Sequence, residues 1–274
     1  MPELPEVETI RRQLSHSIAG EVIEGVEVRN PRCYVGVKMM KGEEIKKVER
    51  KGKYLLIYFT RRNTSAGSVQ GGWVVHLRMT GRFVVDDEWY ETAKHTRVVV
   101  RLVSGRNMYY HSTRMFGYIQ AESDMSRAQK KLEIKLGPEP WEISGSEWKK
   151  RLSKTKRKIK DAILDQHLVA GVGNIYANDA LYLAGIRPQR VADSLNEKEM
   201  ARLLGAIKSV MEKGIRLNGA SDNSYVDALG KKGEYQNEFL VYGKTKGKCP
   251  ECQCQLEYGK VGGRGTWWCG QCQV

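Results

Sequence analysis

The sequence of 274 residues has no hydrophobic run long enough to cross a membrane, which argues against a membrane-spanning protein. Its first eight residues carry three acids and lack the apolar core of a signal peptide, so we expect a cytoplasmic, intracellular protein. Acidic residues are also scarce relative to basic ones: 32 Asp and Glu face 46 Lys and Arg, a net charge of +14. Such an excess indicates a polyanionic partner.

Histidine is scarce too, and the five histidines form no metal or triad pattern. Disulfides are not expected inside a cell, so the six cysteines are more typical of metal ligands or free thiols. Two Cys-x2-Cys pairs separated by sixteen residues match a four-cysteine zinc ribbon. Cys254 could replace Cys252 as a ligand, but the symmetric Cys-x2-Cys spacing favours Cys252. The predicted ligands of one structural Zn²⁺ are Cys249, Cys252, Cys269 and Cys272.

The first half of the chain predicts one amphipathic helix followed by strands. The helix has apolar residues at Leu4, Val7, Leu14 and Ile18. Aromatic and β-branched runs joined by short turns then favour an antiparallel β-sandwich or flattened barrel. The expected strands cover residues 21–28, 44–60, 73–85, 96–103 and 107–120, with a polar turn at 61–72.

The second half changes to a helical period. Capping boxes at Ser144-x-x-Glu147 and Ser194-x-x-Glu197 predict helix starts, and further helices are expected at 156–167 and 175–184. The glycine loop 169–174 would expose backbone N–H groups to a phosphate, although an ordinary turn fits the pattern too. No Gly-Lys-Ser/Thr follows, so it is not a Walker loop.

The fold class is therefore a multidomain α+β protein. Its N-terminal antiparallel β-sandwich has a leading helix, and a helical domain and a zinc ribbon hairpin follow. We expect the leading helix and sandwich at 1–136, a linker at 137–141, a helical part at 142–230 and the ribbon at 231–274.

Pro2 is the most informative residue for chemistry. Removal of Met1 would leave a secondary amine, which can attack a sugar C1′ or a carbonyl and form an iminium that acts as an electron sink. Glu3 is close enough to act as acid or base. The same residues also suit the first turn of a helix, and both interpretations can hold together.

The stretch Met1-Pro2-Glu3-Leu4-Pro5-Glu6-Val7-Glu8 resembles the start of formamidopyrimidine-DNA glycosylases, bacterial enzymes that remove oxidised purines from DNA. The resemblance continues almost end to end. It implies a bifunctional glycosylase and lyase of base excision repair that acts as a monomer. Its substrate would be duplex DNA with 8-oxoguanine, formamidopyrimidines or abasic sites, and β,δ-elimination would follow excision.

The resemblance also assigns roles to individual residues. Pro2 and Glu3 would be catalytic, Lys53 would act at the damaged nucleotide, and Glu6 would support the site. The helical part would be a helix–two-turn–helix element. Phosphate contacts would come from His95, Arg97, Asn174 and Arg264. The wedge that enters the duplex would be Met79, Arg114 and Phe116, and the lesion-reading loop would include Ala220, Ser221, Asn223 and Tyr225.

The chain departs from the family pattern at several of these places. Ser112 and Met115 replace the usual Asp and Lys beside the wedge, and Asp179 replaces a Glu. Ala220 and Asn223 replace Gly and Arg in the lesion loop, so lesion preference does not carry over directly.

Two alternatives stay open at this point. Endonuclease VIII-type enzymes, which remove oxidised pyrimidines, typically begin PEGPE and have different wedge residues, whereas this chain has Leu4. A non-catalytic zinc-bearing nucleic-acid-binding protein would share the charge and the cysteines, but it would not need Pro2, Glu3 or Lys53.

Overall fold

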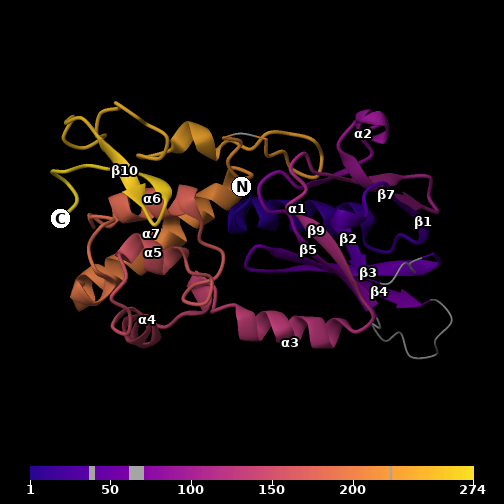
Figure 1. Cartoon of the computed structure of the whole chain (residues 1–274), viewed down its shortest axis with the longest axis horizontal. Helices are drawn as coiled ribbons and strands as arrows, with labels where there is room; N and C mark the ends of the chain where they lie inside the picture. The colour runs from indigo at the N-terminus through magenta and orange to yellow at the C-terminus, as the bar shows by residue number, and fades with distance from the viewer. Residues whose placement is uncertain (37–40, 62–70, 223) are drawn as a thin grey trace. The chain divides into compact units, whose positions relative to one another are not determined.

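The computed structural model describes residues 1–36, 41–61, 71–222 and 224–274 (Figure 1). Most of the predicted polar turn at 61–72, and Asn223 of the predicted lesion loop, therefore lie outside the described residues. The chain forms two compact units, Met1–Ile134 with Leu217–Glu234, and Lys135–Arg216 with Tyr235–Val274. The four-part division expected from the sequence stays a prediction.

Helix α1 (Leu4–Ile18) opens the first unit and confirms the predicted amphipathic helix. Glu3 is its N-cap residue, and the Glu6 carboxylate accepts the Glu3 N–H at 2.7 Å, as in a capping box. The apolar positions Leu4, Val7, Ile10, Leu14 and Ile18 are fully buried. The helix is thus held at its start by a buried carboxylate and along its length by the core.

Two sheets follow, and they make the predicted sandwich. One has the order β2–β9–β5–β4–β3, with β2 (Tyr34–Gly36), β3 (Glu43–Lys51), β4 (Tyr54–Arg61), β5 (Gly71–His76) and β9 (Tyr118–Glu122). The other has the order β1–β7–β8–β6, with β1 (Ile23–Val28), β6 (Arg82–Val85), β7 (Thr96–Leu102) and β8 (Asn107–His111). The pairings are antiparallel except that of β2 with β9, which is parallel.

One hydrophobic core joins α1 to both sheets. It contains Ile10 of α1, Ile57 and Trp73 of the first sheet, and Val98 and Tyr110 of the second, each fully buried. Alternation along each strand places these residues on the inner face. Tyr225 and Ala228 belong to the same core, which explains why the segment Leu217–Glu234 packs with the first unit.

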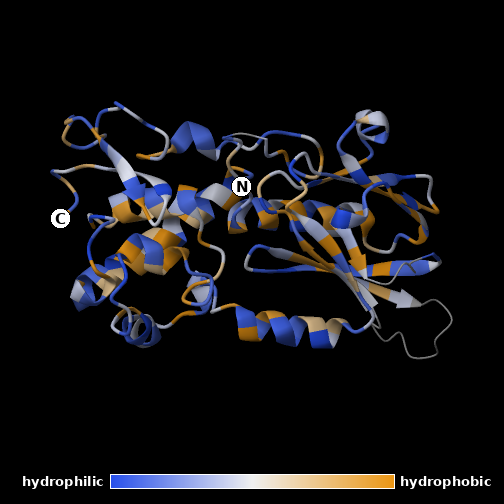
Figure 2. Ribbon diagram, in the orientation of Figure 1, coloured by the Kyte–Doolittle hydropathy of each residue, from blue (hydrophilic) through white to orange (hydrophobic). Residues whose placement is uncertain are grey.

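Shorter elements complete the first unit: η1 (Pro31–Cys33), α2 (Trp89–Thr92) and α3 (Met125–Lys135), whose last residue falls in the second unit. Helix α3 buries Met125, Ala128 and Leu132 on one face, and Figure 2 shows hydrophobic and hydrophilic residues alternating along it.

The second unit is mainly helical and ends in a hairpin. Its elements are η2 (Pro140–Glu142), α4 (Gly145–Leu152), α5 (Ile159–Leu164), α6 (Asn174–Leu183), η3 (Ala192–Ser194), α7 (Glu197–Arg216), η4 (Tyr235–Glu238), β10 (Glu257–Val261) and β11 (Arg264–Trp268). Helix α7 lies against α6 at Gly214, where a Cβ atom would come within 2.5 Å of the Tyr176 ring. Among the described residues, no helix is long and apolar enough to cross a bilayer.

The predicted cap of α4 is confirmed, because the Ser144 hydroxyl accepts the Glu147 N–H at 3.2 Å. The predicted cap of α7 is wrong by two residues. Asn196 accepts the Glu199 N–H at 3.0 Å, and Glu199 accepts the Asn196 N–H at 2.8 Å. An Asn-x-x-Glu box satisfies the same donors as the Ser-x-x-Glu box that we expected.

The helix predicted at 156–167 is also shorter than expected. Before α5, the Arg157 carbonyl accepts the Ala192 N–H at 2.9 Å, and the Ile159 N–H reaches the Arg190 carbonyl at 2.7 Å. These non-local bonds hold the backbone in an extended bridge, which excludes a helical start at 156.

Candidate active site and cysteine cluster

The start of α1 gathers the residues to which the sequence assigned chemistry. Pro2 is buried, and Glu3 and Glu6 are 2% and 1% exposed. Glu6 accepts the Glu3 N–H with one oxygen and the Ala220 N–H with the other, at 2.8 Å. Its carboxylate therefore holds the residue beside Pro2 against the predicted lesion loop.

The described part of that loop packs closely on Glu6. At Gly219, where φ is +83°, a Cβ atom would lie 2.7 Å from the Glu6 side chain, so only glycine fits without displacement. The Tyr225 hydroxyl donates to the Asn218 carbonyl at 3.1 Å, and Ser221 donates to the Tyr225 carbonyl at 2.8 Å. Burial raises the pKa of Tyr225 well above its ordinary value, so the phenol stays a neutral donor.

Lys53 is 6% exposed and follows Gly52 at the turn between β3 and β4. Arg50 connects this turn to α1: it binds Glu8 at 3.0 Å and donates to the Gly52 carbonyl at 3.2 Å. Glu8 also binds Arg11 and Arg12. Burial opposes ionisation of Glu8, but the three guanidinium groups prevail and lower its pKa to about 2.

Sequence reasoning missed this role of Glu8. The sequence did contain a signal for it, since Arg11 and Arg12 follow Glu8 at the i+3 and i+4 positions of a helix. The distant Arg50 had no such signal.

The predicted wedge residues lie together on exposed loops. The Arg114 guanidinium lies over the Phe116 ring, 4.9 Å from its centroid, and its Nη1 is 3.3 Å from the Met79 sulfur. Phe116 is 55% exposed and Met79 43%. Two large apolar side chains beside a cation thus face solvent, an arrangement that suits insertion into a base stack.

Ser112 takes over the anchoring that we expected of the missing Asp. It is fully buried, and its hydroxyl accepts the Met115 N–H at 3.2 Å, where Met115 has φ of 52°. Thr80 accepts the Arg114 N–H at 3.1 Å. A serine therefore suffices to hold the loop that carries Arg114 and Phe116.

His95 and Arg97 also lie beside this loop. Arg97 donates to the Ser112 carbonyl at 2.8 Å, and its Nη2 is 2.9 Å from His95 Nδ1. Because arginine can only donate, Nδ1 of His95 accepts this hydrogen bond. Nearby, burial and then Arg82 lower the pKa of His111 to about 4, so that ring is uncharged at neutral pH.

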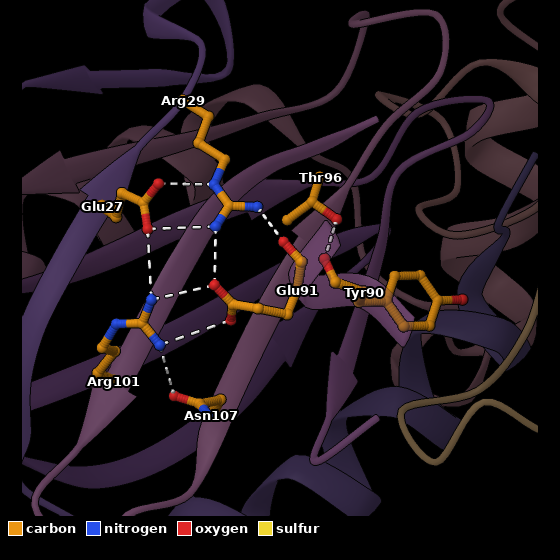
Figure 3. Close-up of polar contacts among 7 residues, drawn as sticks. All are labelled: Glu27, Arg29, Tyr90, Glu91, Thr96, Arg101 and Asn107. Carbon is orange, nitrogen blue, oxygen red and sulfur yellow. Dashed lines mark hydrogen bonds and ion pairs between the residues drawn. The ribbon is translucent and has the colours of Figure 1, made fainter. Parts of the chain in front are cut away.

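The segment that precedes His95 is held by an ion-pair network (Figure 3). Glu91 of α2 binds Arg29 at 2.9 Å and Arg101 at 3.0 Å, and Glu27 binds Arg29 at 2.7 Å. Thr96 donates to the Tyr90 carbonyl at 2.6 Å. The Arg101 hydrogen bond is the main cause that lowers the pKa of Glu91. Most members are partly exposed, so each pair stabilises the fold only modestly.

In the second unit, Asn174 begins α6 and lies beside the hairpin that carries Arg264. Its amide donates to the Gly265 carbonyl at 3.2 Å, while Arg264 is exposed. Gln166 braces the glycine loop by accepting the Gly171 N–H at 2.9 Å. The structure thus brings together the two phosphate contacts predicted for this unit.

Asp179, the other departure from the family pattern, is fully buried. It accepts the Val241 and Tyr242 N–H groups at 3.0 and 3.1 Å and the Tyr235 hydroxyl at 3.1 Å. Burial raises its pKa, and these hydrogen bonds oppose the shift. The shorter acid therefore still anchors the chain between η4 and the hairpin.

The four predicted cysteines form a cluster whose sulfur atoms all lie within 4.8 Å of one another. The Cys249 and Cys272 sulfurs are 3.8 Å apart, and those of Cys252 and Cys269 are 3.5 Å apart. Metal–sulfur bonds of about 2.3 Å in a tetrahedron require sulfurs about 3.8 Å apart. The cluster can therefore hold a metal ion, and Cys254 lies outside it.

Comparison with known proteins agrees with this geometry. Residues 1–119 match the family described as "Formamidopyrimidine-DNA glycosylase N-terminal domain", and residues 136–225 match its H2TH domain. A Desulfitobacterium hafniense protein named "Formamidopyrimidine-DNA glycosylase" is 43% identical, with both chains covered completely. A relative of the same name from Listeria monocytogenes is 38% identical at the same coverage.

A crystal structure of a Lactococcus lactis FPG mutant with DNA containing Fapy-dG superimposes with a TM-score of 0.90. It is 35% identical, and 99% of each chain is covered.

Fold and site together define a DNA glycosylase of base excision repair. The chain belongs to the formamidopyrimidine-DNA glycosylase family. Of the alternatives, the non-catalytic binding protein is thereby set aside.

Proposed function

We propose that this enzyme excises oxidised purines from duplex DNA and then cleaves the abasic site through an iminium at the Pro2 nitrogen. The observation that carries the proposal is the buried start of α1, where Pro2 adjoins Glu3 and Glu6 links that point to the 218–222 segment. The family relationship and the titles of its crystallised members, which name Fapy-dG and abasic-site DNA, support the substrate class.

The chemistry requires Met1 to be removed, because the Met1–Pro2 peptide makes the proline nitrogen an unreactive amide. The freed amine attacks C1′, the glycosidic bond breaks, and the base leaves with a proton. Opening of the sugar gives the iminium, which acts as the electron sink for two eliminations. Loss of the C2′ proton to a base expels the 3′ phosphate, and loss of the C4′ proton from the resulting conjugated iminium expels the 5′ phosphate. Glu3 moves the proton at the sugar, and Lys53 stabilises the departing base or the ring oxygen.

Binding is shared among the other predicted residues. His95, Arg97, Asn174 and Arg264 neutralise backbone phosphates, while the wedge of Met79, Arg114 and Phe116 fills the space of the extruded nucleotide. The loop that includes Ala220, Ser221 and Tyr225 reads the flipped base. In this proposal the enzyme acts as a monomer.

The cysteine cluster holds one structural Zn²⁺ in this proposal. With four thiolates bound, the metal has no open position and stabilises the hairpin that carries Arg264.

The decisive experiment is borohydride trapping on a duplex with 8-oxoguanine opposite cytosine. We expect a covalent complex whose DNA maps to the N-terminal peptide that starts at Pro2. A cross-link on Lys53 or another lysine would overturn the mechanism. A parallel duplex with an oxidised pyrimidine tests the endonuclease VIII-type alternative, which predicts faster trapping there.

A further inference from the structure

A second basic region of the second unit is not used by the proposed function. From Lys149 to Lys160, eight of twelve residues are Lys or Arg, and none is acidic. They cover the end of α4, the connection to α5 and the first turn of α5. No other described region of this unit is as dense in positive charge along the sequence.

Half of these cations have protein partners. Lys149 binds Glu197, Arg151 binds Glu147 at 2.7 Å, and Arg157 binds Asp165 at 2.8 Å. Lys160 is fully buried.

The other four cations are exposed and form no ion pair with any described residue. We call them the lysine surface: Lys150, Lys154, Lys156 and Lys158.

Part of this surface is concave. A cavity of about 560 Å³ is lined by Ser146, Glu147, Lys150, Arg151 and Lys154. Arg151 is held in place because it also donates to the His167 carbonyl at 3.1 Å and the Leu168 carbonyl at 3.3 Å. Its pairing with Glu147 occupies the only acid in the lining, so Lys150 and Lys154 leave the cavity positively charged.

The lysine surface is attached to the same framework as the predicted phosphate contacts. Lys160 donates to the Gly265 carbonyl at 2.8 Å and to Thr266 at 2.7 Å, and Asn174 donates to the same Gly265 carbonyl. A Cβ atom at Gly262 would collide with the Asp161 carboxylate, so the hairpin turn lies directly on α5. Only one residue separates Lys158 from Lys160, so the positively charged segment begins close to the contact between Lys160 and the hairpin.

We propose that the lysine surface binds backbone phosphates of the duplex that flanks the damaged site. The inference rests on the proposed function, which it extends from the central contacts to the outer DNA. Lysine is a mobile point charge that attracts phosphates without reading sequence, as an enzyme that meets lesions in any context requires. An acidic protein partner would usually contribute apolar anchors, and none of the residues that line the cavity has an apolar side chain to receive them.

The test compares two damaged duplexes, one of about 12 and one of about 30 base pairs, with the four lysines changed to glutamine. For the long duplex we expect the slope of log K against log salt to become shallower by roughly 3.6, since each of the four lost phosphate contacts removes about 0.9. Affinity at 0.1 M salt should fall at least tenfold. For the short duplex, affinity and excision rate should stay unchanged.

The matched control changes Lys41, Lys46, Lys130 and Lys131, four exposed lysines of the first unit, to glutamine. It removes the same charge, and the salt slope should stay as in the parent protein. Equal losses on both duplexes, or an unchanged slope on the long one, would overturn the proposal; the second result would leave an acidic protein as the partner. Excision by the parent protein tests the proposed function separately. The role of the lysine surface is judged from how affinity depends on duplex length, which can be measured even if no base is released.

Discussion

Glu3 and Glu6 lie at the start of the same helix and have separate tasks. Glu6 has both oxygens occupied by backbone N–H groups, those of Glu3 and Ala220. It therefore positions the start of α1 and the segment that contains Ala220. Glu3 adjoins the proline nitrogen and is the acid that we propose for proton transfer.

Glu3→Gln should therefore separate chemistry from binding. It keeps the size and a hydrogen-bonding group but removes the acid, so excision in single turnovers should fall by roughly 10²–10⁴-fold. Affinity for damaged DNA should change little. The control Glu24→Gln removes an exposed acid of β1 and should match the parent enzyme. Parent-like excision by Glu3→Gln would contradict the assigned role.

Glu6→Gln should weaken the link between α1 and the loop. An amide has one acceptor oxygen, so one of the two buried N–H groups loses its partner. Such a loss costs about 1–3 kcal/mol. We expect faster hydrogen exchange at the amide of Ala220, with slower excision. Unchanged exchange there would show that the carboxylate does not hold the loop.

Glu8 predicts a pH dependence of stability. Its pKa is lowered from 4.5 to about 2, so the folded state favours the charged form. The stabilisation is complete above pH 4.5 and is lost as pH falls toward 2. Chemical unfolding should find Glu8→Gln less stable than the parent at pH 7, and this difference should shrink between pH 4.5 and 2. A difference independent of pH would mean that the guanidinium contacts do not act through charge.

At the scale of elements, sequence patterns predicted the helices, strands and caps that nearby residues determine. Period and composition gave α1, the cap at Ser144 and the strands of the first half in outline. The single strands predicted at 73–85 and 107–120 are wrong: each is broken by a loop into two strands that join different sheets, β5 and β6 in the first case and β8 and β9 in the second. The errors lie where a distant segment decides. The start of α5 depends on backbone bonds to residues 190 and 192, and no pattern near residue 156 encodes them.

The residues of the candidate site also divide into those that local motifs predict and those that depend on distant partners. Most of its residues came from short motifs, and the structure then showed which of them meet. The Arg50–Glu8 link, the Arg97–Ser112 contact and the Asp179 hydrogen bonds join positions far apart in the chain. Such partners are fixed by packing, which a single sequence does not display.

The wedge loop allows a test at this scale. Phe116 is more than half exposed, and its ring is covered on one face only by Arg114. Phe116→Ala should impair excision of 8-oxoguanine, because the ring offsets part of the unstacking cost. Cleavage at a preformed abasic site should suffer less, since extrusion is easier without a paired base. Both substrates are compared in one duplex and one salt concentration; equal losses would indicate a general defect.

At the scale of the molecule, the two units have separate supports. The first has one core shared by α1 and both sheets, whereas the apolar cluster beside the cysteines of the second is small and includes Tyr182, Val241 and Leu256. Lys160 and Asn178 also hold strand β11 by hydrogen bonds, but the cysteine end of the hairpin would depend on a metal for most of its stability. Loss of the metal should thus unfold the hairpin and leave the first unit intact.

Cys269→Ser tests this directly. Cys269 is fully buried, and its sulfur lies 3.5 Å from that of Cys252 and accepts the Cys272 N–H at 3.4 Å. Metal analysis should give one zinc per parent chain and almost none in the variant. DNA affinity should fall, because Asn174 and Arg264 lose the hairpin that aligns them, while hydrogen exchange in the sandwich strands should stay slow. Cys254→Ser is the matched control, since this thiol lies in the same hairpin region but outside the cluster. Full zinc in Cys269→Ser, or equal zinc loss in both variants, would refute the ligand assignment.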